Sequence, residues 1–201
     1  VPGERFIIRS YSPQTTIAGG IVIDALTAKH RRRDFDEVRS YLRDLLSAND
    51  DNTVKVKLLV DVATVTGIDF AELWSRTAFK IDILTSAIEK NVADKSLVVA
   101  GERFVATQSF NALTKSVESA ISDFHKKKPL AKGISRESLR EKIAAYLPLD
   151  VFNAVITGLH SSGVVVIDKD TIRLAAHKTE LSSDETKLSE KILTSYLNAQ
   201  L

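Results

Sequence analysis

The chain has 201 residues, 44% hydrophobic and 27% charged, which is the composition of a globular protein with one to two domains or three small ones. Its 28 basic and 26 acidic side chains nearly balance, so nucleic-acid contact would have to come from local patches. No run of eighteen apolar residues is present, which excludes a membrane-spanning helix, and the absence of cysteine excludes disulfides and thiolate zinc sites.

The N-terminal residues contain two apolar segments that favour β-structure, Arg5–Arg9 and Thr16–Asp24, on either side of a polar loop. A strand pair of this size is too small to be stable alone. We therefore interpret residues 1–26 as the terminal strands of a domain that lies mostly upstream of Val1.

Residues 27–35 include the run Lys29-His30-Arg31-Arg32-Arg33 and show no apolar period, so they are predicted to form a basic linker. From Asp36 a 3.6-residue period predicts an amphipathic helix. Its apolar stripe consists of Val38, Tyr41, Leu42, Leu45 and Leu46.

Residues 54–66 fit both a strand alternation and a helical period, and their length together with Gly67 favours a helix. Asp69 and Glu72 are spaced as a capping box for a short helix to Ser75, with Ile68 and Leu73 as a hydrophobic staple. Thr77 is then expected to cap another helix. The residues expected to face inward from that helix are Ile81, Leu84 and Ile88.

Two short strands, Leu97–Ala100 and Arg103–Ala106, are predicted around Gly101-Glu102. Helices followed by a β-hairpin within about seventy residues are typical of a winged helix, a helix-turn-helix variant. We assign residues 36–106 to a first winged helix.

The same pattern follows in residues 107–178, which we assign to a second winged helix. Its first helix carries an apolar stripe, Ser135 caps the second helix, Pro148 starts the third and Gly163 ends it. Its wing is predicted at 164–168 and 171–175. The residues expected on the inner faces of the three helices are Leu113, Val117, Ala120, Ile121, Phe124, Leu139, Ile143, Leu149, Phe152, Ile156 and Leu159.

The first helices of the predicted units start near Asp36, Phe110 and Ser183, at spacings of 74 and 73 residues, which indicates an internal repeat of a small domain. Residues 179–201 would supply only the first helix of a third winged helix. Its stripe comprises Leu188, Ile192, Leu193, Tyr196 and Leu197. The predicted fold class is therefore mainly α with small β-hairpins (α+β): tandem winged-helix domains preceded by the terminal strands of a β-barrel domain.

The opening segment, with Arg5, Phe6 and Arg9 followed by Thr16-Ile17-Ala18-Gly19-Gly20, resembles the last strands of the third domain of elongation factor Tu and its relatives. The tandem winged helices that follow are similar to one branch of that family, the bacterial selenocysteine-specific translation elongation factor. Residues 115–145, with Phe124-His125, a basic connector, Gly133 and Leu139-Arg140, look like its second winged helix. The chain thus resembles a C-terminal fragment of such a factor.

This resemblance implies a non-catalytic arm of a cytoplasmic GTP-binding translation factor. The parent would hold GTP and magnesium upstream, and this fragment would hold no cofactor. Implied partners, all through the parent factor, are selenocysteyl-tRNA, the mRNA selenocysteine-insertion hairpin and the ribosome, with no membrane. In Tu relatives the loop corresponding to Ser10–Thr15 lies near the tRNA, which makes Arg9, Tyr11 and Gln14 candidate tRNA-proximal residues.

Other candidate RNA contacts are basic runs that could bind phosphates, although a solvated linker or helix end is the simpler interpretation of each. They are Arg31, Arg32 and Arg33, and Lys126, Lys127 and Lys128. The third helices offer few groups for reading bases, and the second wing tip, Asp168-Lys169-Asp170, would repel phosphate. This favours a structural role over the alternative, a DNA-binding transcription regulator with tandem winged helices.

No catalytic or metal site is expected. The four histidines are too far apart for a paired metal motif and have no cysteine to join. No glycine-rich loop has P-loop spacing, and no nucleophile lies near a base. Trp74, the single tryptophan, is expected to pack in a core or between domains.

Overall fold

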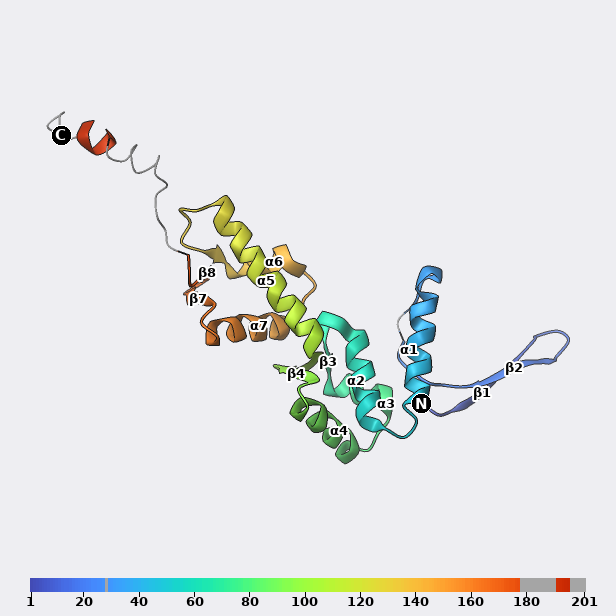
Figure 1. Cartoon of the computed structure of the whole chain (residues 1–201). Coiled ribbons are helices and arrows are strands. Elements are labelled where there is room, and N and C mark those ends of the chain that lie inside the picture. Colours follow the sequence, from blue (N-terminus) through green and yellow to red (C-terminus); the bar gives the residue numbers. More distant parts are fainter. Residues whose placement is uncertain (28, 178–190, 196–201) are drawn as a thin grey trace. The chain divides into compact units, whose positions relative to one another are not determined.

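The computed structural model describes residues 1–27, 29–177 and 191–195. The described residues group into two compact units. The first contains Val1–Asn111 and Pro148–Asn153, and the second contains Ala112–Leu147 and the residues from Ala154 onward. Figure 1 shows the order of helices and strands along the chain.

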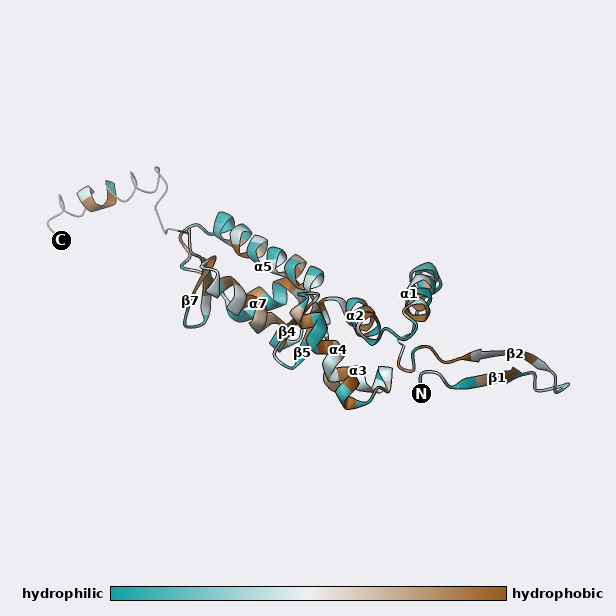
Figure 2. Cartoon of the chain, turned by 60° about the horizontal axis from the view of Figure 1, so that its bottom comes forward, coloured by the Kyte–Doolittle hydropathy of each residue, from teal (hydrophilic) through white to brown (hydrophobic). Residues whose placement is uncertain are grey.

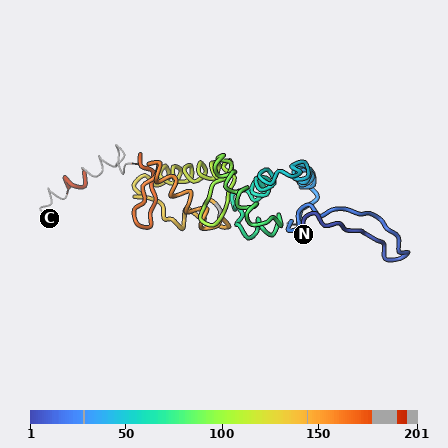
Figure 3. Tube along the Cα trace, turned by 90° about the horizontal axis from the view of Figure 1, so that it is seen from below, coloured from blue at the N-terminus to red at the C-terminus, as the bar shows by residue number. Residues whose placement is uncertain are grey.

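The first unit begins with an antiparallel hairpin of β1 (Arg5–Arg9) and β2 (Thr16–Ile21), in which Ile7 lies opposite Gly19. Figure 3 shows the two strands running side by side as a ribbon. Every residue in the strands except Gly20 is exposed. The Phe6 ring covers Gly20 so closely that a Cβ there would lie 2.6 Å from its tip. The predicted strand pair is confirmed, and it buries no core of its own.

Helix α1 (Phe35–Ser47) follows a short 3-10 helix, η1 (Arg32–Asp34), so the predicted linker is partly helical. The predicted amphipathic helix is confirmed. Its apolar stripe is not uniformly buried, because Leu45 is buried while Leu46 is 58% exposed. Only one side of the stripe therefore packs inward.

A winged helix follows α1. It consists of α2 (Asn52–Ala63), the 3-10 helix η2 (Thr64–Thr66), β3 (Ile68–Asp69), α3 (Phe70–Thr77), α4 (Ile81–Ala93), β4 (Leu97–Ala100) and β5 (Arg103–Ala106). The three strands pair antiparallel in the order β3-β5-β4. Apolar residues from all three helices and the sheet form its core: Val56, Leu59, Val60, Ile68, Leu73, Leu84, Ala87, Ile88, Leu97 and Ala106.

The caps explain where these helices begin. Asp51 starts α2 by accepting hydrogen bonds from the amides of Thr53 (3.0 Å) and Val54 (3.1 Å). Asp69 starts α3 by accepting one from the Glu72 amide at 2.8 Å. The helical interpretation of residues 54–66 is thus confirmed, and so is the predicted N-terminus at Asp69.

The second winged helix repeats the arrangement. Its elements are α5 (Thr107–Lys127), β6 (Ile134–Ser135), α6 (Arg136–Ala144), α7 (Leu149–Ser161), β7 (Val165–Asp168) and β8 (Thr171–Leu174). The sheet order β6-β8-β7 matches that of the first winged helix. Ser135 caps α6 as predicted, accepting from the Ser138 amide at 3.2 Å. Hydrophilic and hydrophobic residues alternate along α5, as expected of an amphipathic helix (Figure 2).

The register of the repeat differs from the prediction. The tripeptide Gly67-Ile68-Asp69 corresponds to Gly133-Ile134-Ser135, 66 residues later, and each isoleucine pairs with the middle strand of its sheet. The first helix of the first winged helix is therefore α2, and α1 lies outside the repeat. The predicted start of the first winged helix near Asp36 was wrong, because an apolar period marks any amphipathic helix equally well. The predicted start of the second near Phe110 agrees with α5, which begins at Thr107.

Three smaller predictions are also wrong. Thr77 belongs to the end of α3, where its hydroxyl donates to the Leu73 carbonyl, and α4 begins without a side-chain cap. Ile81 and Leu149, expected to face inward, are 57% and 56% exposed because each opens its helix. The strands β3 and β6 were not predicted, since two residues are too few to show a period.

Little of the predicted third unit can be compared with the structure, because most of residues 179–201 lie outside the described part. Residues 191–195 are helical, and Ile192 and Leu193 are 49% and 60% exposed.

The glycines before β3 and β6 set the close approach of each short strand to its sheet. Gly67 has φ +62° and ψ 177°, a region open essentially to glycine alone, and an added Cβ would lie 2.8 Å from the Phe104 carbonyl oxygen. At Gly133 the corresponding distance, to the Ile172 carbonyl oxygen, is also 2.8 Å.

We predict that Gly67→Ala lowers the free energy of unfolding by about 2 kcal/mol or more, because it adds backbone strain and a clash with β5. The control is Gly158→Ala in the middle of α7, where nothing lies within 4 Å of an added Cβ. That change should raise stability by about 0.5–1 kcal/mol. Urea denaturation followed by circular dichroism measures both, and equal effects of the two substitutions would contradict the role of Gly67.

Candidate functional site

A buried ion pair joins three separate segments of the first unit. The Asp24 side chain, just after β2, is fully buried and faces Arg76 of α3, whose side chain is 8% exposed. Arg76 donates from Nε to Asp24 Oδ1 at 3.2 Å and from Nη2 to Oδ2. Tyr41 of α1 donates its hydroxyl to Oδ2 at 3.0 Å. We call Asp24, Tyr41 and Arg76 the Asp24 clamp.

The clamp supplies the Asp24 carboxylate with hydrogen bonds and an opposite charge, which offset the free-energy cost of burying it. Besides the clamp donors, the Leu26 amide donates to Asp24 Oδ1 at 3.2 Å. Burial alone raises the pKa of Asp24, but the hydrogen bond and charge of Arg76, with the bonds from Leu26 and Tyr41, outweigh it and hold that pKa below its usual 3.8. Burial and the neighbouring Asp24 charge raise the pKa of Tyr41. Asp24 and Tyr41 are thus an anion and a neutral donor at neutral pH.

Local structure positions the clamp. Asp69 starts α3, and Arg76 lies one turn after Glu72, whose carboxylate is 3.7 Å from Arg76 Nη1. No pattern in the sequence indicates this site, because Asp24 and Arg76 are 52 residues apart and neither belongs to a recognisable motif.

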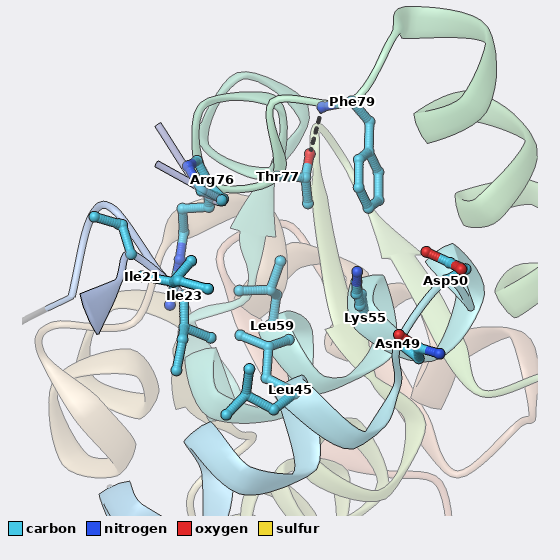
Figure 4. A pocket seen from close by; sticks show the side chains of 14 residues that line it. Ile21, Ile23, Leu45, Asn49, Asp50, Lys55, Leu59, Arg76, Thr77 and Phe79 are labelled. Carbon is cyan, nitrogen blue, oxygen red and sulfur yellow. Dashed lines mark hydrogen bonds between the residues drawn. The ribbon is translucent and has the colours of Figure 1, made fainter. Parts of the chain in front are cut away.

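A cavity of about 360 Å³ lies beside the clamp, between the base of the hairpin and α1, α2 and α3. Figure 4 shows Ile21 and Ile23 on one side of it, Leu45 and Leu59 below, and Arg76 at its edge. The other side of the cavity is polar, with Asn49, Asp50 and Lys55, so its walls are mixed. It is a loosely packed junction behind the clamp.

The predicted linker contacts lie on the surface. Arg31, Arg32 and Arg33 are all exposed around η1. Arg33 Nε lies 3.4 Å from Asp34 Oδ1, and the Arg31 amide donates to Asp34 Oδ2 at 3.1 Å. The guanidinium groups are accessible to a phosphate, and their role in RNA contact stays a prediction.

The second basic run is divided between a helix and a loop. Lys126 and Lys127 lie in the last turn of α5 and Lys128 follows it, so the predicted connector starts later than expected. Lys126 Nζ is 3.7 Å from Asp123, and Lys128 Nζ is 5.7 Å from the centre of the Phe124 ring. All three lysines are exposed, and whether they contact RNA stays a prediction.

The tip of the hairpin carries the predicted tRNA-proximal residues. Arg9 ends β1, Tyr11 is 98% exposed and Gln14 is exposed. The Ser10 amide donates to the Thr15 carbonyl at 2.9 Å and closes the loop around them. The loop therefore presents one aromatic and one amide side chain to solvent, and its contact with tRNA is a prediction.

The third helix of each winged helix lacks a basic surface. On α4 the exposed polar residues include Asp82, Ser86, Glu89 and Lys90, and no lysine or arginine occurs in α7. Trp74 of α3 is 48% exposed, with its indole nitrogen donating to the Phe79 carbonyl at 3.0 Å, so it does not pack in a core, and the alternative of packing between domains stays a prediction. Base readout through these helices has little chemical support.

Two histidines stack in the second unit. The rings of His125 (α5) and His177 lie 3.7 Å apart at 17°, and the Leu174 amide donates to His125 Nε2 at 3.3 Å. His125 Nε2 is therefore an acceptor, and Nδ1 is buried with no partner among the described residues. Burial lowers the pKa of His125 below 6.5, and the charges of His177 and Arg173 lower it further.

Within residues 1–27, 29–177 and 191–195, no group of three or more metal-ligating side chains is assembled. In the same residues, no helix combines the length and apolar character needed to cross a bilayer.

We predict that Arg76→Leu lowers the free energy of unfolding of the first unit by about 3–5 kcal/mol, because it strands the buried Asp24 carboxylate. The double variant Asp24→Leu, Arg76→Leu should recover most of this loss. Trp74 fluorescence during urea denaturation reports the unit directly, since Trp74 lies in the same helix. The control is Lys57→Ala, which removes an exposed 2.8 Å pair with Asp61 and should cost less than about 1 kcal/mol.

We predict that the second unit loses stability in acid because the folded state holds His125 neutral. The lowered pKa means that its contribution is complete above 6.5 and is lost as the pH falls through the folded-state value. Urea denaturation between about pH 7.5 and about pH 5.5 should show this loss, and His125→Gln should reduce it. His30→Gln, in the exposed linker, is the control and should leave the pH dependence unchanged.

Comparison with known proteins gives two matches. A family model described as "Elongation factor SelB, winged helix" matches residues 119–174, most of the second winged helix. The "Selenocysteine-specific elongation factor" of Desulfomicrobium baculatum is 28% identical over 213 residues, an alignment that covers this whole chain. The chain spans about a third of that relative, 32% of its length. Residues 119–174 are thus similar to a winged helix of elongation factor SelB, and the whole chain is similar to about a third of a selenocysteine-specific elongation factor, in agreement with the repeated winged-helix topology.

Proposed function

We propose that this chain is the arm of the translation factor that links a GTP- and selenocysteyl-tRNA-binding body to the winged helices that bind the mRNA selenocysteine-insertion hairpin. In this role the arm performs no catalysis and holds no cofactor, GTP and magnesium being bound elsewhere in the factor. It acts in the cytoplasm and reaches tRNA, mRNA and ribosome through the parent protein.

The observation that carries the proposal is the Asp24 clamp. It ties the segment after the hairpin to α1 and to α3 of the first winged helix through a buried charge pair. Such a connection holds the hairpin in a fixed orientation relative to α1 and α3, because a buried ion pair with several hydrogen bonds tolerates little change in geometry. A mechanical link between a body and a distant tip needs a joint of this kind.

The hairpin supports the same proposal. Its strands leave Ile7 and Ile17 65% and 64% exposed, and Phe6 and Ile8 on the other face are also exposed. A two-stranded ribbon that is apolar on both faces needs cover from other strands. We take β1 and β2 to be the terminal strands of a Tu-like β-barrel domain, as their resemblance to the Tu family implies.

The alternative, a DNA-binding regulator, has weaker support. A winged helix that reads DNA places basic or amide side chains of its third helix on base edges. The faces of α4 and α7 do not provide such a set, and the tip of the second wing carries Asp168 and Asp170.

We predict weak RNA binding by this chain, without sequence preference and with a shallow dependence on salt. The triple variant Arg31→Ala, Arg32→Ala, Arg33→Ala should lower the salt slope of the binding constant by about 2–3 if all three contact phosphates, because each lost phosphate contact removes about 0.7–0.9. Fluorescence anisotropy with labelled hairpin RNA and duplex DNA over a salt series measures this.

The matched control is Lys169→Ala at the wing tip, where Asp168 and Asp170 offset the charge, and its slope should not change. Nanomolar binding to one DNA sequence would contradict the arm and favour the regulator. In the full-length factor, Arg76→Leu should reduce readthrough at a selenocysteine codon while leaving GTP hydrolysis intact.

A further inference from the structure

Helix α1 carries an apolar groove on the side that does not pack inward. Four apolar side chains and two arginines line it, and no carboxylate does: Phe35, Val38, Arg39, Leu42, Arg43 and Leu46. Its volume is about 460 Å³. Phe35 and Leu46, at its ends, are 51% and 58% exposed. The groove is thus an apolar surface edged by two arginines, of which Arg39 also lies 3.9 Å from the exposed carboxylate of Asp36.

The spacing of these residues defines the shape of the surface. Phe35, Val38, Leu42 and Leu46 follow one another at three, four and four residues, which places them in a line along one face of the helix. Arg39 and Arg43 form a second line beside it, four residues apart. A partner helix laid along α1 would meet an apolar stripe with a basic row at one edge.

The other side of α1 is held firmly, so the groove keeps its orientation within the first unit. Tyr41 donates its hydroxyl to the Asp24 carboxylate, and Leu45 is buried. Because α1 is already ordered by these contacts, binding a partner on its other side costs little conformational entropy.

Charge selects among possible occupants. Two copies of α1 packed antiparallel would bring the rows of Arg39 and Arg43 against each other, which disfavours antiparallel self-association. An RNA backbone would pair with the arginines but would leave the four apolar side chains uncovered. An amphipathic helix with carboxylates beside its apolar stripe satisfies both features.

We propose that the outer face of α1 binds an amphipathic helix of a partner protein whose apolar stripe is bordered by aspartate or glutamate. The apolar groove supplies the contact area, and Arg39 and Arg43 select acidic partners and set the orientation of the bound helix. This binding is independent of any contact between the chain and RNA.

The test uses the full chain and two labelled synthetic helical peptides with the same leucine stripe, one bordered by glutamates and the other by lysines. The glutamate peptide should bind at least about tenfold more tightly by fluorescence anisotropy. The double variant Arg39→Glu, Arg43→Glu should reverse this preference. Two-dimensional amide NMR spectra should show the peptide perturbing α1.

Leu42→Ser should abolish binding of the glutamate peptide. Ile81→Ser, which changes an exposed apolar residue at the start of α4, away from the groove, is the control and should have no effect. Circular dichroism verifies that both variants fold.

The proposal is overturned if neither peptide binds or if both bind equally. It is also overturned if sedimentation shows a dimer that Leu42→Ser dissociates, which would assign the groove to a second copy of this chain. Displacement of the glutamate peptide by single-stranded RNA, with RNA perturbing the same α1 resonances, would assign it to nucleic acid instead.

Discussion

The buried pair between Asp24 and Arg76 is the constraint on which the rest of the first unit depends. A carboxylate with no exposed area is stable only when charged and polar donors surround it, and here those donors come from α1, from α3 and from its own loop. The hairpin is therefore attached to the helices at one specific point. Because the nearby packing is loose, with a cavity beside the clamp, the charge pair and not the apolar contacts defines this attachment.

The two winged helices share the same connection between their first short strand and the helix that follows it. In each, a glycine allows the chain to approach the middle strand, an isoleucine fills the core, and an aspartate or serine then caps the next helix. This tripeptide joins strand and helix without a loop, which is why such short strands can order a small domain. The exposed faces of the third helices are left without the charge that a nucleic-acid reader needs, so both units are suited to holding distance and orientation.

The surfaces of α1 and the hairpin are the places where this fold is incomplete by itself. The hairpin exposes apolar side chains on both faces, and α1 exposes an apolar stripe beside two arginines. Small globular domains rarely leave such stripes uncovered unless another molecule or domain covers them. These surfaces, and not the winged-helix cores, are where contacts with other domains or molecules are to be sought.

Local sequence patterns were enough to predict most of the helices and strands. Periodicity and caps located α1, α2 and both wings, and the order of these elements identified the winged helices. The sequence by itself did not determine the repeat register, since α1 and α2 both show an apolar period and only the pairing of Ile68 and Ile134 with their sheets distinguishes them. Nor did it reveal the clamp or the histidine stack, because their residues are far apart in the chain and none of them lies in a sequence motif that indicates a buried polar site. Only the tertiary structure determines which charged and polar groups are buried. Once buried, these groups are desolvated and need hydrogen-bond partners or opposite charges, which here come from distant parts of the chain.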